Sequence, residues 1–237
     1  MNTITHSKAV VLAFLFFISL TTLAQDRSCS MVEHMNVQMQ DPEFVKEYEK
    51  NQAKFRAALA SNLSSNSTTF NRLNPIIIPV AVHFPGGNES DRACLEALAQ
   101  NQIDILNADF TATNSDATLW NSASNNYPGV VHGVANIEFC IATQNHPANT
   151  DAELVEGGPA VSIGYNFGNG NDFDSNWAGY MNFLVKNIGG STLGYSPLGG
   201  SIATGQSVVI NTFAFGSGSG CSGSGVVPAN GFDLGRT

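Results

Sequence analysis

The sequence has few charged residues and lacks the short motifs that usually mark a catalytic centre. Only 12% of its 237 residues are charged, and the formal net charge is −9. No Lys/Arg cluster offsets this acidity, so the surface repels phosphate backbones and we expect no nucleic-acid partner. The chain contains no H-E-x-x-H, C-x-x-C, G-x-S-x-G or G-x-x-x-x-G-K-[ST]. The residues alone therefore reveal no zinc motif, redox dithiol, serine nucleophile or phosphate loop.

Long hydrophobic runs are also scarce. Lys8 precedes one short apolar stretch, Ala9–Leu20, and small residues follow up to Ala24. The stretch is too short to cross a bilayer but fits a secretory signal peptide over residues 1–24. An uncleaved membrane anchor is the alternative, and the length of the stretch argues against it. We therefore expect a secreted protein with no membrane span after signal cleavage.

Cysteines are few, and their pairing is open. In an oxidising compartment, four cysteines allow three connectivities that the sequence cannot separate. They are Cys29, Cys94, Cys140 and Cys221.

The region from 25 to 73 reads as a peripheral helical segment and a linker. Asp41 is a good N-cap, and Pro42 suits the first helical position, where its missing N–H costs nothing. A sparse apolar stripe follows, and we expect it to lie on another part of the molecule. Ser61–Asn74 reads as a polar linker. The stripe consists of Phe44, Tyr48, Phe55 and Leu59.

A compact domain is predicted from 74 to 237. Its first strand, Ile76–Phe84, is apolar enough to be buried on both faces, with Pro79 causing a bulge or an unpaired stretch. We expect Ser90 to cap a helix that runs to about Phe110. A strand, a helix and then several strands indicate a twisted mixed sheet with long helices, an α/β (α+β mixed) fold, rather than a sandwich. The later strands are predicted at Ile137–Thr143, Tyr180–Ile188 and Ser207–Asn211.

Two loops and one histidine have competing interpretations. Asn166–Asn176 carries Asp172 and Asp174, but it lacks the acidic spacing of an EF-hand, so a turn-rich surface loop is favoured over a calcium site. Gly216–Gly225 is predicted to be a flexible loop. His83 lies in a buried strand and is predicted to be a hydrogen-bonded core residue rather than a metal ligand.

Six segments in this order resemble the opening of the pappalysin-family catalytic domain, in its ulilysin-like branch. The front, Arg27–Phe44, resembles the prosegment of that branch. The resemblance covers nearly everything after the signal peptide. It implies the upper, N-terminal subdomain of a metzincin-type catalytic domain, preceded by a helical prosegment over 25–73. The six segments are Ile76–Phe84, Cys94–Asp116, Ile137–Thr143, Tyr180–Gly200, Ser207–Gly216 and Gly231–Thr237.

The resemblance implies a secreted zinc-dependent endopeptidase made as a proenzyme and acting on proteins or peptides. In the family, the sequence G-R-T leads within a few residues to H-E-x-x-H-x-x-G-x-x-H, whose histidines hold zinc. This chain ends at Thr237, so neither catalytic nor metal-binding residues can be assigned within it. The resemblance thus implies a fragment that is inactive alone, with zinc as the cofactor of the intact protein and calcium as a candidate second ion.

Two non-catalytic roles follow from position within the family pattern. The prosegment cysteine of relatives, which can cap the zinc, corresponds to Cys29, although Ser30 replaces the usual glycine. Cys29 could equally be free or disulfide-bonded. The other role is an edge strand that binds extended substrate by β-augmentation; the alternative is an ordinary core or edge strand. Its residues are Ser207, Val208, Val209, Ile210 and Asn211.

A binding or adhesion module is the rival interpretation. It would account for the export, the acidity and the Gly/Asn-rich loops. Loop aromatics forming a flat exposed platform would favour this rival, whereas their packing into a core would favour the peptidase. These aromatics are Tyr165, Phe167, Phe173 and Trp177.

Overall fold

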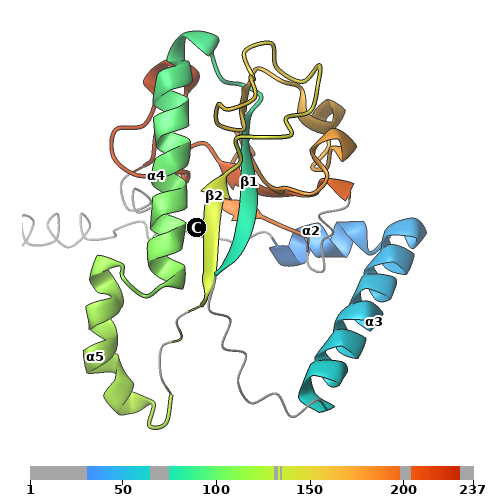
Figure 1. Ribbon diagram of the computed structural model, residues 1–237, viewed down its shortest axis with the longest axis vertical. Coiled ribbons are helices and arrows are strands. Elements are labelled where there is room, and N and C mark those ends of the chain that lie inside the picture. Colours follow the sequence, from blue (N-terminus) through green and yellow to red (C-terminus); the bar gives the residue numbers. More distant parts are fainter. Residues whose placement is uncertain (1–30, 65–74, 131–132, 134, 198–203, 230–237) are drawn as a thin grey trace, which may run out of the picture.

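The computed structural model describes residues 31–64, 75–130, 133, 135–197 and 204–229. It contains a mixed sheet with the strand order β2-β1-β4-β6-β5, and β3 also pairs with β1 (Figure 1). All neighbours are parallel except β5 and β6. The predicted mixed α/β sheet is therefore confirmed. The strands are β1 Ile76–Phe84, β2 Ile137–Ile141, β3 Val161–Ile163, β4 Met181–Lys186, β5 Gly194–Tyr195 and β6 Ser207–Asn211.

Strand β1 has neighbours on both sides and pairs with three other strands. Its first half pairs with β2, and its last residues pair with β3 and β4 together. Only the second half of β1 is buried, and Ile77 at its start is 51% exposed. Pro79 causes no bulge: it lies in register with Cys140, and the pairing with β4 begins at Val80. The missing N–H therefore coincides with the point where the β4 side of β1 is still unpaired.

One face of the sheet is covered by α4, which crosses from β1 to β2 (Figure 1). Leu95, Leu98 and Ile103 of this helix are buried in the main core. The predicted cap is wrong in detail: the Asn88 side chain accepts from the Ser90 N–H at the start of the turn before α4. The α-helices are α2 Met31–Gln38, α3 Pro42–Ser64, α4 Arg92–Phe110 and α5 Trp120–Ala123.

The other face is covered by loops rather than by a long helix. Phe167 and Trp177, from the turns before β4, pack with Tyr180, Leu184 and Val209 in a second core. Two short 3₁₀ turns, Phe167–Gly170 and Ser175–Trp177, carry these aromatic side chains inward. The turn-rich loop predicted for this region thus contributes Phe167 to the second core, and Trp177 follows directly after it.

The N-terminal helices differ from expectation in two respects. Asp41 caps α3 as predicted, accepting from the Glu43 N–H at 2.9 Å. The helix continues into the predicted linker as far as Ser64. Its apolar stripe does not lie on the domain: Phe55 is 64% exposed, and α3 stands apart from the sheet (Figure 1). Instead α2 makes the contact with the sheet. No helix in the described ranges has the length and hydropathy needed to cross a membrane, and residues 1–24 lie outside those ranges.

The glycine-rich segment from 216 to 225 has fixed partners, so the prediction of a flexible loop is wrong. A disulfide joins Cys221 to Cys94 of α4. The Gly216 N–H donates to the Gln102 side chain at 2.8 Å. Gly216 has φ +75°, and a Cβ there would lie 2.4 Å from a methyl carbon of Leu98. Glycine is required there because both the backbone angle and the close approach exclude a side chain.

His83 is a hydrogen-bonded core residue, as the sequence predicts. Its ring is fully buried, with Nδ1 2.7 Å from the Ser162 hydroxyl and Nε2 3.1 Å from the Asn182 amide oxygen. The Asn182 nitrogen donates to backbone carbonyls, so its oxygen is the acceptor for His83. His83 therefore carries its proton on Nε2 and accepts from Ser162 at Nδ1. Burial lowers the pKa of His83 to about 4, against weaker opposing effects of Asn182 and Asp174.

We predict that the disulfide stabilises the fold substantially. A cross-link across 127 residues of sequence restricts the unfolded chain, which corresponds to about 4 to 5 kcal/mol in the chain-entropy model. A Cys94→Ser/Cys221→Ser double variant should lose stability of this order in urea unfolding. Cys140→Ser, which removes a free, half-buried thiol, is the matched control and should cost less than about 1 kcal/mol. An equal loss in both variants would contradict the prediction.

We also predict that His83 makes the fold acid-sensitive. The neutral ring is required in the folded state, whereas the unfolded chain binds a proton below about pH 6.5. Stability from this residue is therefore fully present above pH 6.5 and falls as the pH drops toward 4, by on the order of 3 kcal/mol. Ring ¹⁵N shifts should show a neutral Nε2–H form at pH 5, and titration of His83 near pH 6.5 would contradict it.

Candidate functional site

The sheet ends on one side at β5, which is not the edge strand that the sequence predicts. The predicted strand has the correct bounds and is β6, but β6 lies between β4 and β5. Its assignment to the sheet edge is therefore wrong, and its role in binding substrate remains a prediction. In β5, Gly194 lies opposite Ile210 and Tyr195 opposite Val209. Two paired residues leave no periodic pattern, so sequence periodicity could not reveal this strand.

The opposite edge, at β2, is closed by one side chain. The amide nitrogen of Asn107, on α4, donates to the Phe139 carbonyl at 2.8 Å. The amide oxygen of Asn107 accepts from the Phe139 N–H, also at 2.8 Å. This amide thus makes both hydrogen bonds that a residue of a further strand would make. A strand adding to β2 would have to break both bonds, so this edge is a poor place for strand addition.

The N-terminal helix α2 lies against β5. One face of α2 is buried or half-buried, and its four residues recur at helical spacing. On the opposite face, Val32 and Val37 are each 67% exposed. The His34 ring stacks on Tyr195 with centroids 4.3 Å apart. A small hollow of about 150 Å³ lies between Met31 and strands β5 and β6. The four residues facing the sheet are Met31, His34, Met35 and Gln38.

A charged pair lies beside this contact. The Lys186 ammonium, at the end of β4, is 2.6 Å from an Asp172 carboxylate oxygen. The Tyr195 hydroxyl donates to the other oxygen of Asp172 at 3.0 Å. Burial, the Asp172 charge and this hydrogen bond raise the pKa of Tyr195 well above its usual value. Tyr195 therefore remains a neutral hydrogen-bond donor, and its ring supports His34.

The loop aromatics test the adhesion-module interpretation. Phe167 and Trp177 are buried, at 2% and 0% exposure, and only Phe173 of the four is largely exposed, at 53%. Tyr165 is half-buried, and its hydroxyl donates to Asp174 at 2.6 Å. They pack mainly into the core and form no flat platform, which is the arrangement expected for the peptidase.

The two loop carboxylates are held by different partners. Asp174 accepts hydrogen bonds from the Tyr165 hydroxyl and from the Gly168 and Asn176 N–H groups. Burial opposes its ionisation, but these hydrogen bonds outweigh it and lower the pKa of Asp174. Asp172 is engaged by Lys186. Within the described ranges, no three His, Cys, Asp or Glu side chains are grouped to hold a metal ion.

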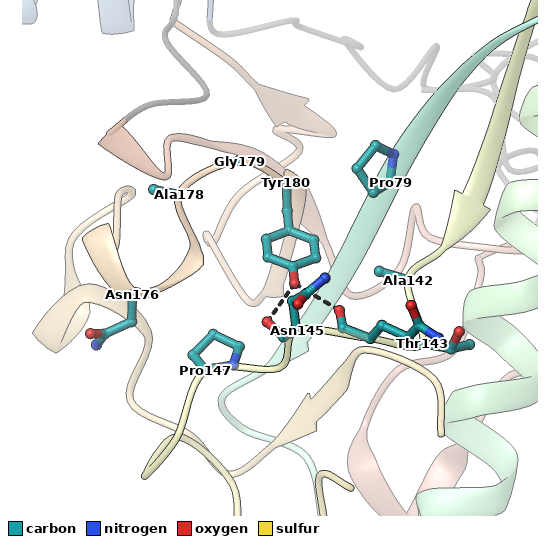
Figure 2. Close-up of a pocket in the computed structure, with 10 residues that line it drawn as sticks. Pro79, Ala142, Thr143, Asn145, Pro147, Asn176, Ala178, Gly179 and Tyr180 are labelled. Carbon is teal, nitrogen blue, oxygen red and sulfur yellow. Dashed lines mark hydrogen bonds between the residues drawn. The ribbon is translucent and has the colours of Figure 1, made fainter. Parts of the chain in front are cut away.

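A larger open hollow of about 510 Å³ lies beside β1 and β2 (Figure 2). Figure 2 shows the Tyr180 hydroxyl at its wall, donating to the carbonyls of Gln144 and Asn145 at 3.1 and 2.7 Å. The remaining lining is uncharged, including Pro79 and Asn176. Such a surface offers hydrogen bonds but no carboxylate, imidazole or thiol for acid–base or nucleophilic chemistry.

Two cysteines are not part of the disulfide. Cys140 lies within the described ranges and Cys29 lies outside them. Cys140 is a free thiol on β2, at the opposite end of the sheet from β5. Burial, and next the Glu138 charge, raise the pKa of Cys140 and make it less reactive. Cys29 lies outside the described ranges, two residues before Met31. The residues that sequence reasoning missed at β5 are His34, Tyr195 and Lys186, none of which belongs to a recognisable motif.

The chain is similar to solved structures of known proteins, but it matches no family model. No family model and no curated protein matches the chain. A promirolysin mutant from Tannerella forsythia is 26% identical over 88% of this chain and 64% of its own, with TM-score 0.54. Mature T. forsythia mirolysin with a cleaved peptide is 26% identical over 68% and 59%, with TM-score 0.47. Mirolysin with compound 9 is 28% identical over 68% and 59%, with TM-score 0.49.

The fold of this chain is related to that of promirolysin, whose superposition has a TM-score above 0.5, whereas the other two superpositions are below it. That structure covers 88% of this chain. This chain spans 64% of its length, which is less than two thirds. The sheet, the helix α4 and the loops described above thus form a fold related to the metzincin-type catalytic domain of a metallopeptidase zymogen.

Proposed function

We propose that the intact protein is a secreted zinc-dependent endopeptidase of the pappalysin kind, made as a proenzyme. In this proposal, the chain contains the signal peptide, the prosegment and the upper part of the catalytic domain, and the zinc ligands lie in sequence beyond Thr237. One observation carries the proposal. In a fold related to a metallopeptidase zymogen, a helix from the N-terminal segment lies across the outermost strand, β5.

The proposed substrate-binding strand is β5 rather than β6. An extended peptide can add to an exposed sheet edge through main-chain hydrogen bonds. The edge at β2 is occupied by the Asn107 amide, whereas β5 is the last strand at the other end. The predicted strand Ser207–Asn211 supports β5 from the inner side. Peptide segments are therefore expected to bind along Gly194–Tyr195, where α2 now lies.

Cys29 remains the candidate zymogen cysteine. The Cys94–Cys221 disulfide removes two of the four cysteines from consideration. Cys140 lies on β2, whereas Met31, two residues after Cys29, lies against β5 at the opposite end of the sheet. A Cys29–Cys140 bond is the alternative, and we propose that Cys29 is instead a free thiol. A thiolate is a good zinc ligand, so such a thiol could hold the proenzyme inactive.

The described residues do not supply a zinc site, so we assign no catalytic step to them. Zinc, when bound, would polarise the water that attacks a peptide carbonyl. The part played by this chain is to position the substrate backbone along β5 and to cover that strand before activation.

The coding sequence after Thr237 and the protein made from it test this function. We expect H-E-x-x-H-x-x-G-x-x-H within a few codons. The longer protein should bind about one zinc ion and, after removal of its N-terminal segment, cleave protein in a chelator-sensitive way. The 237-residue chain alone is the matched control and should do neither. A stop codon directly after Thr237 would contradict the proposal and favour the binding-module interpretation.

Photo-cross-linking tests the binding strand. A specific protease site inserted before Pro75 allows the N-terminal segment to be removed from the folded longer protein. A peptide with a photoreactive side chain should then attach to residues 193–196. The same peptide with N-methylated backbone amides is the control and should label poorly, because it cannot donate main-chain hydrogen bonds. Labelling at Ser207 and Val208 instead would contradict the assignment to β5.

A further inference from the structure

The contact between α2 and β5 depends on a histidine in an unusual position. His34 occupies the centre of the helix face that lies on the sheet, stacked on the Tyr195 ring. Its Nε2 atom is shielded from solvent and has no hydrogen-bond partner among the described residues. A neutral imidazole can leave one ring nitrogen unpaired at moderate cost. An imidazolium would bring a charge and a second N–H donor into the same place, and both would need partners.

The charged groups around His34 only partly compensate a positive charge. The loop before β4 presents Asp172, β4 presents Lys186, and β5 presents the neutral Tyr195. On α2 itself, Glu33 is exposed. Burial lowers the pKa of His34; the Asp172 charge opposes this, and the Lys186 charge adds to it. Because Asp172 is already paired with Lys186 at 2.6 Å, its attraction for a second cation is weakened.

We propose that α2 is a pH-dependent latch, which lies on β5 while His34 is neutral and is released when His34 takes up a proton. This regulation rests on the proposed function, because release would expose β5 to a peptide substrate. The predicted effect is confined to the contact between α2 and β5. Both the ring stack on Tyr195 and the shielded Nε2 of His34 belong to this contact and not to the core of the sheet. The N-terminal segment would thus leave the strand more readily in an acidic environment.

The direction of the effect follows from the linkage between docking and proton binding. A released His34 binds a proton near its usual pKa of 6.5, and the docked residue does so only at lower pH. The contribution of His34 to docking is therefore fully present above pH 6.5 and is lost progressively as the pH falls below that value.

Hydrogen exchange of the 237-residue chain tests the latch directly. Peptides covering α2 and β5 are followed by mass spectrometry at about pH 7.5 and about pH 5.5, with rates corrected for intrinsic exchange. We expect the corrected rates of α2 and β5 to rise severalfold more at the lower pH than those of β1 and β4, which report the global loss of stability caused by His83. Unchanged rates in α2 and β5 would overturn the proposal.

Three variants separate His34 from other titrating groups. His34→Phe keeps a ring on Tyr195 but cannot be protonated, so α2 should stay protected at both pH values. His34→Ala removes the ring and should expose α2 at both. Glu33→Gln, a change of an exposed residue on the same helix, is the matched control and should open at low pH like the unmodified chain. Opening of His34→Phe at low pH would overturn the role of His34.

The latch and the proposed function can fail separately, because the exchange measurement needs no peptidase activity. Release of α2 at low pH in a protein whose longer form cleaves nothing would uphold the latch and reject the peptidase. Chelator-sensitive cleavage by the longer protein, with α2 equally protected at both pH values, would uphold the peptidase and reject the latch.

Discussion

The hydrogen bonds of the His83 ring join three neighbouring strands that are far apart in the sequence. His83 lies on β1, Ser162 on β3 and Asn182 on β4. The His83 ring is buried against Phe167 and Trp177, which offer its nitrogen atoms no hydrogen bond. The two ring nitrogens are therefore satisfied by Ser162 and Asn182. This arrangement fixes β4 beside β1, and β4 in turn carries β6 and β5. The position of the sheet edge therefore depends on a polar contact in the middle of the core.

The two ends of the sheet differ in how their edges are protected. At β2 an amide of α4 makes the missing strand hydrogen bonds, so this protection is built into the domain. At β5 the neighbour is a short helix of the N-terminal segment, which precedes α3 and β1 in the chain. A permanent cover suits an edge that must not pair, and a separable cover suits an edge that is to be used. This asymmetry is the physical basis for placing function at β5.

The elements predicted correctly are those with a long, consistent pattern. Ile76–Phe84 and Ser207–Asn211 are strands with the predicted bounds, and the helix predicted to end at Phe110 does so. The errors fall where local pattern and tertiary contact disagree. The glycine-rich segment 216–225 looks flexible by composition, yet it is held by a disulfide and by contacts with α4. The apolar stripe of α3 suggests packing, yet Phe55 is exposed.

The sequence by itself determined the class of fold, the bounds of the strand Ile76–Phe84 and the absence of a recognisable catalytic motif, because these depend on runs of residues and on exact spacings. Only the tertiary structure decided which strand ends the sheet, which cysteines pair and what covers the edge. Strand order and disulfide pairing join residues such as Cys94 and Cys221, whose separation in sequence carries no information about their distance in space. The face of α2 that meets β5 includes His34 and Gln38, which hydrophobic periodicity does not count as contact residues.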